Sequence, residues 1–435
     1  MTPEISARRR RDIIDALRRG VVPSNGLDAL AVGLDRFAAA LDDDLDRVSG
    51  GGSVFKAVRG EYGAGKTFFA RWLAERAKRR GFAASEVQIS ELETPLHRME
   101  TVYRRLVEHL ATEQFGPSAL RPVLDGWIFA LEEDALAGGA VAEDDAEALD
   151  RAVGELMERR LAGISRSTPG FGAALRGYRA AGAADDRATA DGLAAWLGGQ
   201  PHVAASARRA AGVKGELDHF GALSFLQGLL TVLRDSGHPG LLLVLDEVET
   251  LQRVRSDARD KALNALRQLV DEIYSGRFPG LFLVITGTPA FFDGPQGVQR
   301  LAPLAQRLAT HFDPEPRWDN PRAVQLRLPG FSLDALVELG ARVRDIYHSP
   351  RVDERVDDAY LGELARAVTG RLGGQVGVAP RVFLKKLVAD VLDRVDQFDD
   401  WDPREHYELT LRTDELTEVE RNAAARSAGD VDLPV

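Results

Sequence analysis

Cysteine is absent from this 435-residue chain, which excludes disulfide bridges, thiolate zinc sites and cysteine nucleophiles. The eight histidines are scattered and form no HExxH-like pair, so the sequence does not indicate a transition-metal centre. Apolar runs such as Leu241–Leu245 are far shorter than the roughly 20 residues that a membrane-spanning helix needs. Because Met1 to Arg11 is polar and Arg-rich, it does not have the pattern of a secretory signal, and we expect a cytoplasmic protein with no membrane contact.

Lysine is also scarce, with seven among the 56 basic residues, so a lysine inside a motif is informative. The formal net charge of −11 argues against a protein that coats nucleic acid nonspecifically. The charge is uneven, because Arg8–Arg19 is basic whereas Leu131–Asp150 carries eight acidic residues and no Lys or Arg. The basic segment is compatible with a weak DNA contact and equally with a solvated or partner-facing helix, since no aromatic residues interleave it.

The hydrophobic pattern predicts an α/β protein whose parallel sheet is covered by helices on both faces. Strands are expected at Val54–Val58, Glu86–Ser90, Leu241–Leu245, Gly280–Ile285 and Val324–Leu328. Helices are expected at Arg8–Arg19, Leu27–Val48, Thr67–Arg80 and Ala262–Tyr274, and again between Phe331 and Phe398. About 150 residues separate the second strand from the third, far more than a plain crossover needs, so we expect a helical insertion there.

The same pattern divides the chain into four parts, since 435 residues favour one large domain with a smaller one beside it. The parts are N-terminal helices and a turn-rich linker at 1–50, an α/β core at 51–330 with the insertion at about 95–238, a helical region at 331–400, and a charged tail at 401–435.

The segment Gly60-Glu-Tyr-Gly-Ala-Gly-Lys-Thr67 fits the pattern GxxxxGK[ST] without a departure. Glycines let successive backbone N–H groups converge on phosphate, and the helix that follows adds its dipole. Lys66 would reach the β- and γ-phosphate oxygens of ATP, and the Thr67 hydroxyl would ligate Mg²⁺. A chance glycine-rich turn is the alternative, but the required strand before the loop and helix after it are both expected. The candidate phosphate-binding residues are Gly60, Gly63, Ala64, Gly65, Lys66, Thr67 and Phe68.

Polar residues follow the expected buried strands Leu241–Leu245 and Gly280–Ile285, whose carboxyl ends should meet at one edge of the sheet. Asp246 would complete the magnesium site, and Glu247 would polarise the water that attacks the γ-phosphate. Alone, the two carboxylates could be an acidic helix cap; downstream of a phosphate loop they indicate a hydrolysing ATPase. Thr286 is the candidate sensor of the γ-phosphate and Thr288 its alternative, although a simple Thr-Gly turn is also possible there.

Three arginines are candidates for contacts with the nucleotide. Arg381 follows Pro380 at the start of a helix in the C-terminal helical region, from where it could reach back over the nucleotide. Arg307 and Arg300 are expected on the helix before the last strand, where Arg307 could enter the site of a neighbouring subunit. Each could instead be an arginine on a solvated face.

The order of these motifs resembles that of the AAA+ ATPases, and within them the initiator and origin-recognition-like branch. The resemblance implies an AAA+ αβα core, a C-terminal helical lid, a homo-oligomer, and a linker, here Gly20–Gly26 with Val22 and Pro23, beside the adenine. Relatives of that branch carry a winged-helix DNA-binding domain after the lid. Only about 35 residues follow Phe398 here, too few for such a domain, which puts sequence-specific DNA recognition in doubt.

Three segments are more closely similar to the BrxD-type ATP-binding proteins of bacterial BREX phage-exclusion cassettes: Arg18–Pro23, Val54–Phe69 and Arg277–Pro289. This resemblance implies a role in antiphage defence beside a partner helicase. We therefore expect an ATPase that assembles on DNA and recruits or loads that helicase. The alternative is an ATP-dependent signalling or assembly switch without direct DNA action.

Overall fold

The computed structural model describes residues 5–138, 145–374, 377 and 379–424. Its centre is one parallel sheet of five strands in the order β2-β3-β4-β1-β5. The strands are β1 (Val54–Arg59), β2 (Ala83–Gln88), β3 (Leu241–Asp246), β4 (Leu281–Gly287) and β5 (Gln325–Arg327). The prediction of an α/β protein with a parallel sheet is confirmed.

Helices make up most of the rest of the described chain. Those before β3 are α1 (Ala7–Arg18), α2 (Asp35–Ser49), α3 (Lys66–Arg79), α4 (Met99–Glu108), α5 (Leu120–Ala137), α6 (Ala146–Ser167), α7 (Pro169–Ala183), α8 (Arg187–Leu197), α9 (Ala205–Ala210) and α10 (His219–Asp235). Those after β3 are α11 (Ser256–Tyr274), α12 (Pro289–Asp293), α13 (Ala302–Leu308), α14 (Leu333–Tyr347), α15 (Pro350–Arg355), α16 (Asp358–Arg371), α17 (Pro380–Lys385), α18 (Asp393–Gln397), α19 (Pro403–His406) and α20 (Glu418–Ala424).

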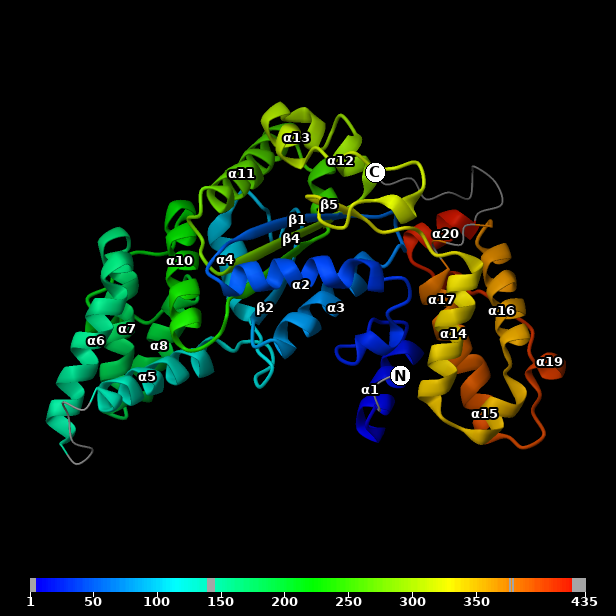
Figure 1. Cartoon of the computed structure of the whole chain (residues 1–435), viewed down its shortest axis with the longest axis horizontal. Helices are drawn as coiled ribbons and strands as arrows, with labels where there is room; N and C mark the ends of the chain where they lie inside the picture. The colour runs from blue at the N-terminus through cyan, green and yellow to red at the C-terminus, as the bar shows by residue number, and fades with distance from the viewer. Residues whose placement is uncertain (1–4, 139–144, 375–376, 378, 425–435) are drawn as a thin grey trace.

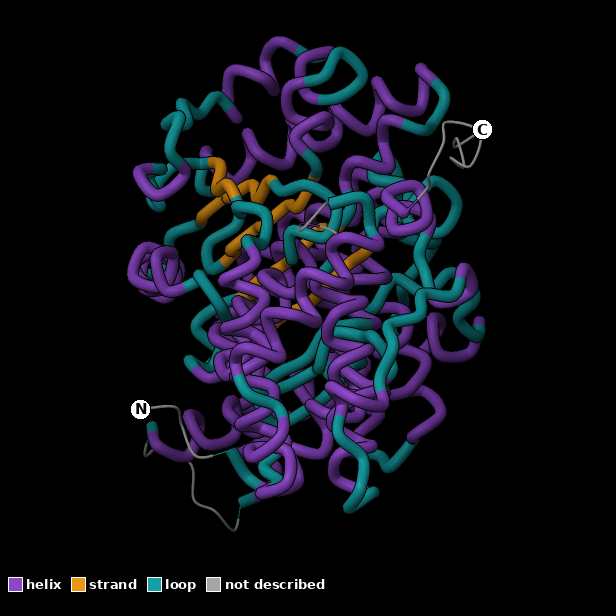
Figure 2. Tube along the Cα trace, turned by 90° about the vertical axis from the view of Figure 1, so that its right-hand side faces the viewer, coloured by secondary structure: helices purple, strands orange, loops and turns teal. Residues whose placement is uncertain are grey.

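The central strands β1, β3 and β4 are buried on both faces because apolar residues fill most of their positions. Side chains alternate along a strand, so Leu241, Leu243 and Leu245 of β3 join the core under α4, α10 and α11. Leu242 and Val244 point to the other face, into the core with α2 and α3. Figure 2 shows the strands enclosed by helices. This two-sided burial explains the continuous apolar run that identified β3 in the sequence.

The segment between β2 and β3 is helical, as expected, and runs through helices α4 to α10. In Figure 1 helices α5 to α8 extend from one end of the sheet, opposite the C-terminal helices. Buried aromatic residues of this segment, Trp127, Phe171 and Phe225, belong to the same hydrophobic cluster as β3 and β4. The insertion is thus packed continuously onto the sheet.

Helix α1 packs against the C-terminal helices and not against the sheet (Figure 1). Ile13 and Leu17 are buried in a separate hydrophobic cluster with residues of α14, α16 and α17. Arg18 also forms two hydrogen bonds with Asp393, of 2.6 and 2.8 Å. The first helix and the C-terminal helices from α14 onward therefore form one packed unit, although more than 300 residues separate them.

The structure corrects several predicted boundaries. Strand β2 ends at Gln88, so it lies earlier than the predicted Glu86–Ser90. The predicted helix Leu27–Val48 is a short 3-10 turn followed by α2, because Gly33 adopts a left-handed φ of 73° between them. Arg300 lies in a 3-10 turn and only Arg307 lies on α13. The described part of the charged tail, up to Ala424, is folded, with Leu409 and Leu411 packed on the C-terminal helices.

No helix in the described ranges is long and apolar enough to cross a membrane.

Candidate nucleotide-binding site

The glycine-rich loop joins β1 to α3, and two of its glycines adopt the left-handed backbone conformation. Gly63 and Gly65 have left-handed φ values of 81° and 86°, which would strain a residue with a side chain. Gly65 directly precedes the first turn of α3, where the backbone N–H groups have no partner within the helix. A loop of this form at a helix N-terminus is suited to bind phosphate.

Lys66 is the first residue of α3, and its side chain turns back into the loop. Its ammonium nitrogen donates hydrogen bonds to the carbonyl oxygens of Gly60, at 3.0 Å, and Glu61, at 3.4 Å. The same nitrogen lies 3.5 Å from a carboxylate oxygen of Glu249 and 5.1 Å from the centre of the Tyr62 ring. Lys66 is only 8% exposed. Without phosphate, the loop itself and Glu249 thus hold this charge.

Asp246 ends β3 beside the start of α3. The Thr67 hydroxyl donates to Asp246 Oδ2 at 2.9 Å, and the Thr286 hydroxyl donates to Oδ1. A hydroxyl and a carboxylate are oxygen donors that suit Mg²⁺, which in nucleotide sites binds one or two protein groups together with phosphate oxygens and water. Within the described residues no cluster of three or more His, Asp or Glu side chains is suited to hold a metal by itself. The donor set therefore fits a magnesium ion shared with phosphates.

Glu247 projects from a left-handed turn directly after β3, with φ of 59°, an uncommon value for a residue other than glycine. Its backbone N–H lies 3.1 Å from Asp246 Oδ1 and 3.2 Å from Thr286 Oγ1, so both side chains fix the turn. Gln88, the last residue of β2, donates a hydrogen bond of 2.8 Å to the Glu247 carboxylate. This turn directs the Glu247 side chain to the cavity above the loop.

Two residues of this group were not identified from the sequence. Gln88 is a polar residue at the carboxyl end of a strand, the same signal that identified Asp246 and Thr286, but the predicted strand ran past it. Glu249 follows Glu247 by two positions and is 5% exposed. Burial raises the pKa of its carboxyl group, and nearby Lys66 opposes that rise. Its orientation toward Lys66 depends on the 3-10 turn after β3, which the sequence pattern does not reveal.

A cavity of about 640 Å³ opens beside the loop, between the sheet and the C-terminal helices. Most of its lining is apolar, which suits the face of a purine base. The lining includes the linker residues Val22 and Pro23, Phe68 of α3, Phe331 and Leu339, and the loop residues from Gly63 to Thr67. The structure thus brings the linker and the glycine-rich loop to one cavity, although Gly60 itself is not part of the lining.

Arg381 is at the start of α17 and also lines this cavity. Its guanidinium group is engaged with the end of the chain: Nε donates to Glu420 Oε1 at 2.8 Å and Nη2 to the Glu415 carbonyl at 2.7 Å. Glu420 is only 4% exposed. The arginine therefore lines the cavity, but its charge is neutralised by Glu420 of α20.

Arg307 and Arg300 do not line the cavity. Arg307 forms an ion pair with Asp271 of α11, and Arg300 forms one with Asp260 of the same helix. Thr288, the alternative to Thr286, is 4% exposed and precedes α12. Neither arginine could contact a nucleotide in its own chain from these positions, so a contact with a neighbouring subunit stays a prediction.

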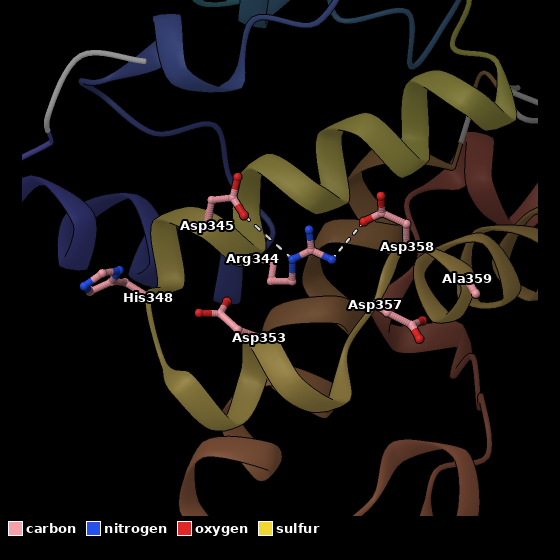
Figure 3. A pocket seen from close by; sticks show the side chains of 7 residues that line it. All are labelled: Arg344, Asp345, His348, Asp353, Asp357, Asp358 and Ala359. Carbon is pink, nitrogen blue, oxygen red and sulfur yellow. Dashed lines mark hydrogen bonds and ion pairs between the residues drawn. The ribbon is translucent and has the colours of Figure 1, made fainter. Parts of the chain in front are cut away.

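A second hollow, of about 810 Å³, lies on the C-terminal helices and contains none of the predicted residues (Figure 3). Asp345, Asp353, Asp357 and Asp358 surround Arg344 there. Arg344 lies 2.8 Å from Asp358 and 3.7 Å from Asp345, so it already compensates part of the acidic charge.

The chain combines a parallel α/β sheet with a glycine-rich loop, a carboxylate pair at the end of β3 and an apolar cavity beside them. These features define a candidate nucleotide-binding protein. The family model described as "BREX system ATP-binding protein BrxC/D" matches residues 5–411, and the chain belongs to this family. The predicted resemblance to BREX ATP-binding proteins is thereby confirmed. Comparisons with curated proteins and with solved structures found no match.

Proposed function

We propose that the protein binds ATP with Mg²⁺ at the glycine-rich loop and hydrolyses it to ADP and phosphate. Family membership supports ATP as the ligand. The proposal of hydrolysis depends on four residues that lie together at one end of the cavity: Lys66, Thr67, Asp246 and Glu247. A module that only holds nucleotide would need no carboxylate beside the Asp246–Thr67 pair to activate water.

In this proposal each group has one role. Backbone N–H groups of the loop from Gly63 to Thr67 and the Lys66 ammonium bind the phosphates, while Val22, Pro23 and Phe68 contact the base. Thr67 and Asp246 would hold the magnesium ion, which neutralises phosphate charge in the transition state. Glu247 takes a proton from the attacking water, and Gln88 orients its carboxylate. Thr286 keeps Asp246 and the Glu247 turn in place and would respond to the γ-phosphate through them.

The arrangement of the C-terminal helices supports an AAA+ type of ATPase with a helical lid. Residues of α14 and α17 line the same cavity as the loop, so a change in the bound nucleotide would alter their contact with the sheet. Arg381 would sense the nucleotide within the chain, and Arg307 would act on a neighbouring subunit of a homo-oligomer. We propose that this change drives assembly on DNA and recruits or loads the helicase of the defence cassette.

The test of this function is steady-state ATPase activity of the full chain with and without DNA and with and without Mg²⁺. Magnesium-dependent turnover is expected, with a rise when DNA or the partner helicase is added. Binding of DNA and helicase should then be compared in ATP, in ADP and in the variant Glu247→Gln, which retains ATP. If neither interaction depends on nucleotide, the loader function is wrong.

An ATP-dependent signalling or assembly switch is the second candidate. The net charge of −11 favours the switch, because a negative surface repels DNA phosphates. The basic α1 is then the segment available to contact DNA. Nucleotide-dependent self-association that is unaffected by DNA would support the switch over the loader.

A further inference from the structure

Glu249 is a buried carboxylate in the nucleotide cavity with no role in the proposed hydrolysis. It is 5% exposed and lines the cavity beside the glycine-rich loop. One of its oxygens lies 3.5 Å from the Lys66 ammonium. The other, Oε2, is buried and has no hydrogen-bond partner in the described part of the chain.

The buried carboxylate of Glu75, which has a structural role, is held in a different way. Glu75 of α3 is 8% exposed, and its two oxygens accept backbone N–H groups of Gly26 and Leu27 at 2.9 and 2.8 Å. Both oxygens of Glu75 are therefore satisfied, and it fixes the linker. Glu249 instead leaves Oε2 without a hydrogen-bond partner and faces Lys66 as its nearby cation, and an incompletely paired buried charge is costly to keep. That cation is the one that the phosphates would also bind.

We propose that Glu249 is a positioning residue that holds Lys66 in the empty site and competes with the nucleotide for it. When phosphates enter, the Lys66 ammonium turns to their oxygens, and Glu249 is left as a buried negative charge facing a polyanion. After hydrolysis the ion pair re-forms, which favours the release of ADP. Glu249 thus lowers the affinity for both ATP and ADP and speeds product release. The proposal rests on the proposed function, since it requires ATP at this loop.

The test is nucleotide binding to the full chain by isothermal titration calorimetry, together with the release rate of a fluorescent ADP. Glu249→Gln keeps the shape and removes the charge, so ATP and ADP should bind roughly tenfold tighter and ADP should leave more slowly. Glu249→Met removes the charge with an apolar side chain and should act in the same direction. The matched control is Asp235→Asn, which breaks the 2.9 Å ion pair with Arg160 outside the cavity and should leave affinity unchanged.

Weaker or unchanged binding by Glu249→Gln, with Glu249→Met in agreement, would overturn the competition with Lys66. A structural role would lower the melting temperature of free and bound protein alike. The competition instead predicts a larger nucleotide-induced rise in melting temperature, because Lys66 lacks its carboxylate counter-ion only in the free variant. Failure of the wild-type chain to bind any nucleotide would refute the proposed function itself, a result distinct from wild-type binding that Glu249→Gln does not tighten.

Discussion

Residues 62–67 with Glu247 and Glu249 line the phosphate side of the cavity, and Arg381 with its surroundings in α17 lines the C-terminal side. On the phosphate side, short local segments fix each group, because strand ends, a glycine loop and a helix start determine where the side chains lie. On the C-terminal side, Arg381 is held by Glu420, which belongs to a different helix. Apart from the contact of Glu249 with Lys66, the first side is determined mainly by strand ends and the glycine loop, and the second by the packing of distant helices, so single substitutions should affect them differently.

The largest effect should come from Glu247→Gln on the phosphate side. The amide keeps the hydrogen bond with Gln88 but cannot accept a proton from water, so turnover should fall about 10³-fold while ATP affinity stays the same. Phosphate-release assays and ATP titrations measure the two quantities. Glu272→Gln, which weakens the ion pair with Arg277 outside the cavity, is the matched control and should retain turnover. Normal turnover of Glu247→Gln would refute its role.

The next largest effect should be the loss of nucleotide affinity in Lys66→Ala. Charge-assisted hydrogen bonds to phosphate are worth about 1.5–3 kcal/mol each, so binding should weaken about 100-fold. Lys78→Ala on the same helix, outside the cavity, is the control and should bind ATP normally. Comparable binding by wild type and Lys66→Ala would remove the phosphate assignment from the whole loop.

Arg307→Ala should lower turnover with unchanged ATP affinity, if it enters a neighbouring subunit where it stabilises the transition state. Mixing it with Lys66→Ala subunits should restore activity, because each variant supplies what the other lacks. Arg277→Ala, which also breaks an ion pair to α11, is the control. Wild-type turnover by Arg307→Ala would leave Arg300 as the candidate, or it would mean that no arginine on this surface acts on a neighbouring subunit.

Gln88→Ala should lower turnover about tenfold, since the Glu247 carboxylate loses the hydrogen bond that orients it. ATP affinity should be unchanged, because Gln88 does not line the cavity. Gln88→Glu places a second negative charge beside Glu247 and should reduce turnover further. If Gln88→Ala turns over at the wild-type rate, the hydrogen bond contributes nothing to the reaction.

The smallest effect is expected on the C-terminal side, from Glu420→Gln. It weakens the ion pair that neutralises Arg381, so turnover should rise about threefold as the arginine becomes free to contact nucleotide. The rise should vanish in an Arg381→Ala background. Asp414→Asn is the control, because Asp414 pairs with Arg412 in the same segment and does not contact Arg381. A fall in turnover would mean that Glu420 orients Arg381 for its function.

The phosphate side could be predicted from the sequence for a physical reason. Parallel strands end at one edge of a sheet, so polar residues that follow Val54–Arg59, Leu241–Asp246 and Leu281–Gly287 must meet there. Thr67, Asp246 and Thr286 were identified separately from the sequence, and in the structure the Asp246 carboxylate accepts hydrogen bonds from both threonine hydroxyls. Gln88 was missed only because the end of β2 was placed two residues too late.

The sequence by itself determined the α/β class, the helical insertion and the glycine-rich loop, because hydrophobic periodicity and glycine spacing are local properties. Only the tertiary structure decided that α1 packs on the C-terminal helices, that Glu249 faces Lys66, and that Glu420 holds Arg381. Each of these depends on how distant helices or a short turn are oriented, and the burial of a charge is decided by all the neighbours around it. No spacing rule within one segment contains that information.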